Sequence, residues 1–573
     1  MIVPVKYVCY ASFQNRQRGS QIKNKENGSM KKKVQRMIAG AMAVTMAAAL
    51  VSGCSISSTE TTGTAGTGTE TSQTPQIEEP VQLSWLMGRN SAEVDDDSPV
   101  VKKIEERFNI DLKGFYVDAT NFQENLNVKF AGGEMPDIMV IDTPAMLATY
   151  VEGGIVGELP IEVIREKAPN FTKIADQYDD GSLWGTMIYE GKNYGVSNPM
   201  QVVPMAMFWR KDWLDKLNLE VPETLEEYEK VLTAFVENDP DGNGKKDTAG
   251  MAERSFNAVF GAFGLRCTSG LSTTSGFVVE EMQLGEDNVP FFPYIRPEAK
   301  EALTVLHDWY TKGIIDKEFI TGENHGGYTA LSHSFMNGQI GLTSAQTYHY
   351  FGHSQDMSDV RNRGTCLKEL LAVNPEAEVV IGPAPAGPDG KSGTEGWGKV
   401  GTLTCLTTNA ANDPRKVDAF LAMLDAYYSD PEYMELVSYG IEGITFTKDG
   451  DERKRLGEMS DLDLRKEGIY QVDFGDTVTF MQNIKPAQTK FAEEVTGNGY
   501  YRFNVPAVAE FSNVIANLDT LTEQAYFAII TGEKPIDYFD TYVEEFKAAG
   551  GEAAEKAVQE AYAEKLAAVK IDR

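Results

Sequence analysis

Apolar positions alternate between short strand-like runs and helical stripes in the first part of the chain. The pattern predicts three strands and two helices, the strands at 81–87, 110–117 and 137–141 and the helices at 100–108 and 122–130. In the first helix Val101, Ile104 and Phe108 fall on one face, as an amphipathic helix requires. The run DIMVI at 137–141 is too apolar to be exposed on either face. Strands that alternate with helices predict an α/β lobe with a mostly parallel sheet.

Further along, an apolar strand at 204–209 leads into a helix, and the most clearly marked helix start follows. Thr224 and Glu227 have the spacing of a capping box, and an apolar stripe continues from it through Leu225, Tyr228, Leu232 and Phe235. Trp213 and Trp309 also fall on helical stripes, which predicts that both are core residues. The last third is expected to be mostly helical, at 414–433 and from 507 to the end.

Composition narrows the class of protein. The chain has 573 residues, enough for two or three domains, with 53 Lys and Arg against 85 Asp and Glu and a net charge of −32. A phosphate backbone selects clustered basic residues, and none are clustered beyond residue 36. Nucleic acid is therefore excluded as a partner.

The first 53 residues have the order of an export signal. Lys31, Lys32, Lys33 and Arg36 form a basic region, and the apolar run 37–51 is shorter than the ~20 residues of a membrane-spanning helix. Val51-Ser52-Gly53-Cys54 resembles the lipobox of bacterial lipoproteins, which implies that Cys54 is lipidated. Because Met30 opens this signal, residues 1–29 are expected to be a mis-assigned start. The alternative is a buried cysteine in an ordinary helix.

Residues 54–80 follow as a lipidated cysteine and a tether rich in Ser, Thr, Gly and Glu, a composition that cannot bury enough apolar surface to fold. Removal of 1–53, with nine basic residues and one acidic residue, leaves 44 basic and 84 acidic residues and a net charge of −40. The sequence thus predicts an acidic protein anchored by lipid at the extracellular face of a cell membrane.

Motifs for catalysis and redox chemistry are missing from the sequence. Cys267, Cys366 and Cys405 have no CxxC spacing and are expected to be buried small apolar residues, and neither HExxH nor GxSxG occurs. GPDGKS at 387–392 lacks the first glycine of a phosphate-binding loop and predicts a hairpin turn with Asp389-Gly390 at its tip. A pair of carboxylates for glycosidase chemistry stays open among 85 acidic residues.

Several segments together resemble one family in their order and spacing. They are RKDWLDKL at 210–217, VPETLEEYEKVLTAF at 221–235, DPDGNGKKDT at 239–248, WYTKGIID at 309–316, GP at 382–383 with PDGK at 388–391, and IITG at 529–532 with FDTYV at 539–543. The chain resembles the extracellular solute-binding proteins of family 1, in the large lipoprotein subgroup that includes alginate-binding proteins. That resemblance implies a type II periplasmic-binding-protein-like fold of two α/β lobes, closing on a carbohydrate for delivery to an ABC transporter permease.

On this basis the first lobe is expected at 81–200 plus 335–400. The second lobe is expected at 201–334 plus 401–573, with the C-terminal helices. The chain is expected to act as a monomer.

The segment 239–248 has the oxygen-rich pattern that Ca²⁺ prefers, with acidic or amide side chains two residues apart and glycines for a tight turn. Gly250 stands where an EF-hand would have its glutamate. The resemblance implies a structural Ca²⁺ site, with Lys245 contributing its backbone oxygen and Thr248 in place of the family's glutamate. The predicted ligands are Asp239, Asp241, Asn243, Lys245, Asp247 and Thr248. The alternative is a metal-free turn.

Sugar binding needs aromatic platforms and polar groups on loops that follow strands or cross between lobes. Trp397 is the first choice, because Gly396 and Gly398 suit a backbone that passes close to a ligand. The other candidates are Arg89, Asn90, Asp142, Thr143, Tyr194, Asn198, Tyr348, His349, Tyr350 and Tyr439, each of which has core packing or a solvated loop as its alternative. A tethered glycoside hydrolase or polysaccharide lyase is the rival function, and an adhesin without a small ligand is the third.

Overall fold

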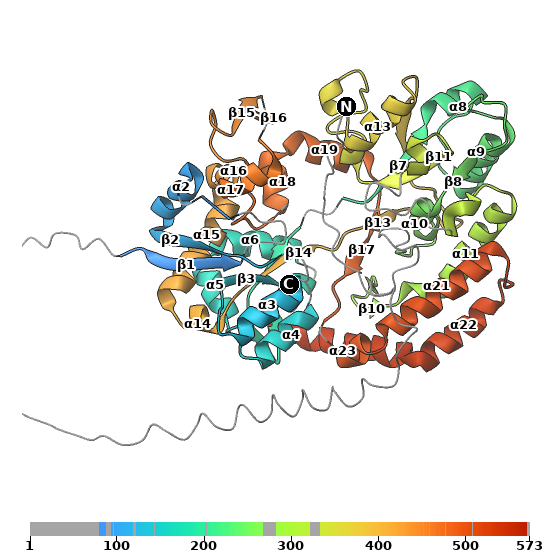
Figure 1. The fold of residues 1–573 in the computed structure, drawn as a ribbon. Coiled ribbons are helices and arrows are strands. Elements are labelled where there is room, and N and C mark those ends of the chain that lie inside the picture. The colour runs from blue at the N-terminus through green and yellow to red at the C-terminus, as the bar shows by residue number, and fades with distance from the viewer. Residues whose placement is uncertain are drawn as a thin grey trace, which may run out of the picture. The chain divides into compact units, whose positions relative to one another are not determined.

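The computed structural model describes most of the chain beyond residue 78. The described residues are 79–86, 93–95, 97–118, 122–141, 144–179, 181–200, 203–267, 282–320, 333–450, 452–457, 459–475, 477–506 and 508–569. They belong to one compact unit that begins at Glu79. Within it, separate apolar cores define two lobes (Figure 1). The proposed export signal lies outside the described residues, as do five candidate site residues: Cys54, Arg89, Asn90, Asp142 and Thr143.

A five-stranded sheet forms the centre of the first lobe, in the order β2–β1–β3–β14–β6. Its strands are β1 (Val81–Leu86), β2 (Ile110–Phe115), β3 (Ile138–Ile141), β6 (Val196–Pro199) and β14 (Val400–Leu406). β1 is parallel to β2 and β3, whereas β14 is antiparallel to β3 and β6. Parallel neighbours need a crossover connection, which α2 (Pro99–Phe108) and α3 (Phe122–Ala131) supply. The predicted α/β lobe is therefore confirmed.

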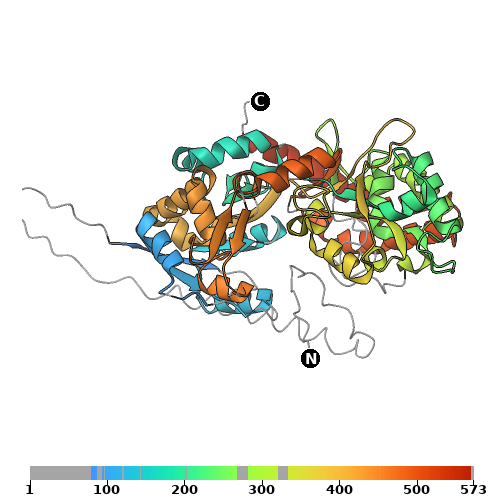
Figure 2. The same ribbon diagram turned by 90° about the horizontal axis from the view of Figure 1, so that it is seen from above.

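The helices of the first lobe come from two distant stretches of sequence. They are α4 (Pro144–Glu152), α5 (Ile161–Lys167), α6 (Pro169–Tyr178), α7 (Ser182–Gly185), α14 (Thr408–Ala411), α15 (Pro414–Ser429), α16 (Pro431–Tyr439), α17 (Asp461–Lys466) and α18 (Val478–Ile484). Two small hairpins belong with them, β4–β5 (Ile188–Tyr189, Lys192–Asn193) and β15–β16 (Phe446–Asp449, Glu452–Arg455). Figures 1 and 2 both show the orange helices of the later stretch beside the blue start of the described chain. Trp85 on β1 and Phe420 and Tyr427 on α15 share one core.

Two four-stranded sheets build the second lobe. One has the order β12–β7–β11–β8, formed by β12 (Val379–Gly382), β7 (Ala206–Arg210), β11 (Ile340–Ala345) and β8 (Ala249–Met251). The other has the order β10–β9–β17–β13, formed by β10 (Pro290–Phe291), β9 (Met282–Leu284), β17 (Gly499–Phe503) and β13 (Thr394–Gly396). Trp213 and Trp309 are buried in this lobe, as predicted.

Helices cover these sheets. They are α8 (Lys211–Leu217), α9 (Leu225–Glu237), α10 (Phe256–Gly261), α11 (Pro297–Thr311), α12 (His333–Met336), α13 (Thr365–Val373), α19 (Pro486–Val495), α20 (Ala509–Ser512), α21 (Ile515–Thr531), α22 (Tyr538–Phe546) and α23 (Glu552–Val569). Short helical turns are η1 (Glu253–Ser255), η2 (Pro293–Ile295), η3 (Lys317–Ile320), η5 (Thr347–His349), η6 (Val360–Asn362) and η7 (Lys547–Gly551). The predicted capping box at the start of α9 is confirmed, since Thr224 and Glu227 each bond the other's backbone N–H.

Within the described ranges the chain passes between the lobes at three places: between β6 and β7, between β13 and β14, and at Lys485 between α18 and α19. Consequently 335–396 lies in the second lobe and 400–484 in the first, which differs from the expected boundaries. β11 and β12 pair with β7, while β14 pairs with β3 and β6. An apolar run shows that a strand exists, but long-range pairing decides which sheet it joins.

Two smaller expectations, buried cysteines and a turn at Asp389-Gly390, are also met. Cys267, Cys366 and Cys405 are buried free thiols. Gly390 has φ 74° in a tight turn where the Gly387 N–H donates to the Lys391 carbonyl at 2.8 Å. Within the described part of the chain, no helix is long and apolar enough to cross a membrane.

Candidate ligand site at the lobe crossings

The first two crossings connect strand ends of the first lobe to strand ends of the second. In the first lobe β6 runs toward Pro199, which pairs with Val400 at the start of β14. In the second lobe β11 ends at Ala345, opposite Ala206 at the start of β7. Loops at the carboxyl ends of strands are the usual ligand sites of open α/β sheets. The crossings are therefore where a ligand would contact both lobes.

The two crossing segments are hydrogen-bonded to one another at both ends. Near the first lobe the Met200 N–H donates to the Lys399 carbonyl at 2.9 Å. Near the second lobe the Met205 N–H donates to the Glu395 carbonyl at 3.0 Å, and the Thr394 hydroxyl donates to the Met205 carbonyl at 2.7 Å. The crossings thus form a paired connection rather than two independent linkers.

Trp397 lies in the second crossing, half-buried, directly after β13. Its neighbour Gly396 pairs with Tyr501 in β17. A Cβ on Gly398 would lie 2.7 Å from the Arg502 carbonyl oxygen, so only glycine fits there. The glycines around Trp397 therefore allow close packing against β17, which fixes the backbone that carries the indole.

The three neighbouring aromatic residues after β11 have different environments. Tyr348 is 46% exposed, and its ring centroid lies 4.4 Å from that of His349, which is buried. Tyr350 is fully buried and packs on Phe208 and Phe335, with centroid distances of 4.2 and 5.6 Å. Of the three, only Tyr348 presents an exposed ring, and Tyr350 is a core residue.

Asn198 is buried, and both ends of its amide are occupied by protein groups. The Nδ2 group donates to the Thr402 carbonyl at 3.2 Å, and Oδ1 accepts from the Tyr428 hydroxyl at 2.9 Å. Asn198 therefore joins β6 to β14 and α15 in this structure. Its predicted contact with a sugar would require these bonds to break.

Tyr194 and Tyr439 lie away from the crossings. Tyr194 precedes β6 at the amino end of that strand, the end opposite Pro199. Tyr439 ends α16 and packs on Phe446, with ring centroids 5.8 Å apart. Among the described candidates, Trp397 lies on a crossing, Asn198 lies in β6 next to one, and Tyr348, His349 and Tyr350 follow the end of β11.

A buried polar cluster beside the crossings is absent from the sequence predictions. Arg254, in η1 after β8, donates from Nε to the Ser344 carbonyl at 3.0 Å. Asn257 donates to the Arg254 carbonyl at 2.6 Å and accepts from the Glu395 N–H at 3.4 Å. Arg266 lies 3.8 Å from the Glu395 carboxylate. The feature of the sequence that could have indicated this cluster is the charged pair Glu253-Arg254, which follows soon after the apolar strand β8.

β17 is a second feature that the sequence predictions omit. Its residues Tyr500 and Tyr501 pair with Glu395 and Gly396 on β13, directly before Trp397. Burial raises the pKa of both tyrosine hydroxyls. The signal in the sequence was the run GYYRF, in which strand-forming aromatic residues follow a glycine.

His349 should make stability depend on pH. Burial, reinforced by the charge of Arg254, lowers the pKa of His349 to about 4, against 6.5 for a free histidine. Below pH 6.5 the unfolded chain takes up a proton that the folded protein excludes, so stability falls as the pH falls from 6.5 toward 4. At pH 5 the loss is about 2 kcal/mol. Denaturant unfolding at pH 7 and pH 5 measures it.

His349→Gln should remove that part of the pH dependence, and the exposed His333→Gln serves as the control. An equal loss of stability between pH 7 and pH 5 in wild type and His349→Gln would show that His349 is not responsible.

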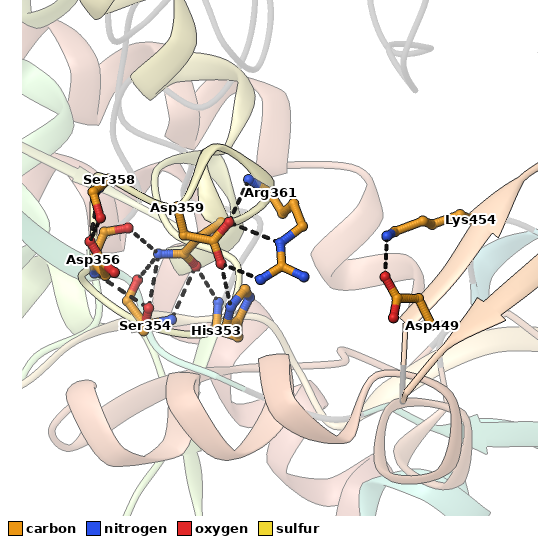
Figure 3. A network of polar contacts seen from close by, with 9 residues as sticks. His353, Ser354, Asp356, Ser358, Asp359, Arg361, Asp449 and Lys454 are labelled. Atoms are coloured by element: carbon orange, nitrogen blue, oxygen red, sulfur yellow. Dashed lines mark hydrogen bonds and ion pairs between the residues drawn. The ribbon is translucent and has the colours of Figure 1, made fainter.

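A loop between η5 and α13 is held by one buried amide. Asn362 accepts from the His353 and Ser354 N–H groups at 2.7 and 3.1 Å and donates to the Asp356 carbonyl at 3.1 Å. Figure 3 shows Arg361 in this loop beside Asp359, facing the Asp449–Lys454 pair of the β15–β16 hairpin. The loop belongs to the second lobe and the hairpin to the first, so these charges face one another from different lobes.

The segment 239–248 forms a tight turn of oxygen-bearing side chains after α9. Gly242 and Gly244 have φ of 74° and 77°, as expected of a turn that needs glycine. Asn243 donates from Nδ2 to Asp241 at 2.6 Å and to Asp247 at 2.9 Å. A hydrogen bond from Asp241 lowers the pKa of Asp239. Two carboxylates thus share the Asn243 amide, and the third, Asp239, accepts from the Gly244 N–H at 3.0 Å.

These residues fit a Ca²⁺ ion in donor type. Turning the Asn243 amide would present its oxygen, and the Lys245 carbonyl belongs to the same turn. Thr248 does not fit, because it is buried and its hydroxyl donates to the Phe235 carbonyl at 3.0 Å. As arranged here, no three His, Cys, Asp or Glu side chains in the described ranges form a metal-binding group.

A cavity of about 490 Å³ lies elsewhere, among η3, α21 and α22. Its lining includes Ile320, Leu521, Phe527, Lys534 and Tyr538, and none of its lining residues belongs to a crossing. It is therefore separate from the candidate ligand site.

Residues 100–450, more than half of the chain, match the family model of bacterial extracellular solute-binding proteins. The chain belongs to this family, which confirms the resemblance seen in the sequence. Members bind solutes outside the cytoplasm, as the family description states.

Two curated relatives from Bacillus subtilis (strain 168) match over nearly their whole length. The polygalacturonan/rhamnogalacturonan-binding protein YtcQ is 23% identical over 491 residues, which cover 84% of this chain and 91% of YtcQ. Lipoprotein LipO is 25% identical over 535 residues, 91% of this chain and 97% of LipO. The solved alginate-binding protein AlgQ2 without calcium ion has a TM-score of 0.57 at 20% identity, covering 85% of this chain and 98% of that one. The expected two-lobe solute-binding fold is confirmed.

Proposed function

We propose that this protein captures a carbohydrate, most simply an oligosaccharide, between its two lobes and delivers it to an ABC importer. The observation that carries the proposal is the paired crossing, which joins strand ends of the two lobes and carries the half-buried Trp397, with the exposed Tyr348 in the turn after β11. An aromatic face stacks on the apolar face of a pyranose and leaves the ring hydroxyls to polar groups. The polysaccharide-binding names of YtcQ and AlgQ2 support a sugar as the ligand.

Binding without chemistry can be tested directly. Purified protein would be mixed with mono-, oligo- and uronic saccharides, and its thermal unfolding followed. A ligand at a hundredfold excess over its Kd stabilises the folded state by about 2.7 kcal/mol, so a true ligand should raise the melting temperature clearly. Chromatography of the mixture should recover the sugar intact.

The rival functions give different results in that experiment. Shortened or unsaturated sugar products would favour a tethered hydrolase or lyase. No shift with any saccharide, together with binding to a surface polymer, would favour an adhesin.

We further propose that Cys54 anchors the protein by lipid at the extracellular face of the cell membrane, where a monomer would meet its permease. The order of basic, apolar and small residues before Cys54 supports this, as does the relationship to lipoprotein LipO. Mass spectrometry of protein from membranes should find a lipidated N-terminal Cys54. Cys54→Ser should release the protein into the medium. An unmodified Cys54, or cleavage at another site, would contradict the anchor.

We also propose a structural Ca²⁺ ion in the turn 239–248. The gathered carboxylates of Asp239, Asp241 and Asp247 support it, because a cation would relieve their mutual repulsion. Asn243 and the Lys245 carbonyl would complete the protein ligands, with water at the remaining positions. The ion would stabilise the turn and would have no part in holding the sugar.

A further inference from the structure

The backbone on both sides of Trp397 is attached to the second lobe. Gly396 is in register with Tyr501, and Gly398 lies against the Arg502 carbonyl. β17 continues into Phe503, which is buried in the second-lobe core. The backbone that carries Trp397 is therefore part of the second lobe, although it lies in a crossing.

Buried polar contacts made by Asn257 and Arg254, called the clamp below, also hold the segment that precedes Trp397. Asn257 is 1% exposed, and its side chain connects the Arg254 carbonyl to the Glu395 N–H. Its Nδ2 group also lies 3.2 Å from the Ser344 hydroxyl on β11. A buried amide that loses such bonds leaves unsatisfied polar groups, so the arrangement resists rotation.

Arg254 extends the clamp to the first crossing. It is 3% exposed and lies with Nη2 3.9 Å from the Met205 sulfur, while Nε bonds Ser344. Gln346, at the end of β11, donates to the Val203 carbonyl at 3.1 Å. Both crossings are thus tied to the second-lobe sheet by side chains.

Where the crossings enter the first lobe, the strand pairing is irregular. The register between β14 and β6 shifts between Val400 and Leu403, which marks a bulge. A bulge interrupts the ladder and bends the strand. The irregular backbone therefore lies between Val400 and Leu403, beyond the clamp.

We propose that Asn257 and Arg254 are positioning residues that fix Trp397 to the second lobe. This lobe then carries a preformed half of the sugar site, and the first lobe moves over it by bending at 400–403. The inference rests on the proposed function, since it assumes that Trp397 contacts the sugar. A ligand would dock first on the second lobe and drive closure by preferring the closed state.

Hydrogen exchange of the ligand-free protein tests the clamp without any ligand. Asn257→Ser should speed exchange at 395–398 at least tenfold and leave β14 unchanged. Asn362→Ser, at another buried asparagine, should leave 395–398 unchanged. Unchanged exchange at 395–398 in Asn257→Ser, or equal acceleration in β14, would overturn the proposal.

Gly398→Ala gives a second variant if Asn257→Ser folds poorly. The added Cβ would meet the Arg502 carbonyl at 2.7 Å and should displace 396–398, again with faster exchange there. Gly497→Ala is the matched control, because a Cβ at that position meets nothing within 4 Å. Equal exchange at 396–398 in both variants would count against attachment to β17.

Measurements of sugar affinity then distinguish a positioning role of Asn257 from a general effect on stability. They use the saccharide that gives the largest thermal shift. Asn257→Ser should weaken binding about tenfold in the wild-type background and less than twofold in a Trp397→Ala background. Independent, multiplying losses would overturn the proposal. If no saccharide binds wild type, the proposed function fails, whereas the exchange experiment still decides whether the clamp exists.

Discussion

Trp397→Ala should weaken sugar binding at least tenfold, which corresponds to about 1.4 kcal/mol. Trp397 is half-buried and follows β13 at the point where the crossing leaves the second lobe. Stacking on a sugar ring would bury the remaining indole face, and burial of an aromatic side chain is worth about 1.5–3 kcal/mol. Isothermal titration with the identified saccharide measures the loss.

The loss should come from the ligand site and leave the fold intact. Trp397→Phe should recover part of the affinity, because a smaller ring still stacks. Tyr439→Ala, at a half-buried aromatic residue away from the crossings, should bind as wild type does. Wild-type affinity in Trp397→Ala would remove Trp397 from the site.

Removal of Ca²⁺ should destabilise the protein by about 2.7 kcal/mol when the ion had been present at a hundredfold excess over its Kd. The turn 239–248 keeps three carboxylates close together, and without a cation they repel one another. EDTA should therefore lower the melting temperature, and added Ca²⁺ should restore it. The Kd for the sugar should change little when Ca²⁺ is removed, because the turn lies outside the crossings.

Asp241→Ala should abolish the response to EDTA. Glu237→Ala, at an exposed carboxylate just before the turn, should keep it. A melting curve that EDTA does not change, together with purified protein free of metal, would favour the metal-free turn.

Local patterns in the sequence were enough to predict many elements of the fold. Strands β1, β2 and β3, helix α2 and the capped start of α9 follow from periodicity and from residues three or four positions apart. The lobe boundaries were not predictable in this way. β14 joins the first-lobe sheet through pairs with Ile141, more than 250 residues earlier in the chain, and no local signal encodes that partner.

In the candidate site, too, features set by local sequence were predictable and features set by distant residues were not. The glycines on both sides of Trp397 predicted a backbone that approaches another group closely. Gly398 does so, but the group that it approaches is the backbone of β17. Asn198 had the polar character of a ligand contact, but Tyr428, 230 residues away, accounts for its amide oxygen. Asn257 was missed because a buried polar group and a solvated loop residue look alike until distant partners are known.

The interaction between the charged side chains of the loop 353–362 and those of the β15–β16 hairpin should depend on the ionic strength of the medium. The Lys454 ammonium is the main cause of the lowered pKa of Asp449, and the charge of Arg361, carried by the other lobe, lowers it further. Both side chains are largely exposed, and dissolved ions screen such attraction over about 8 Å at physiological ionic strength. Higher ionic strength should therefore weaken this contact between the lobes, and sugar titrations at low and at high salt concentration would measure its contribution to capture.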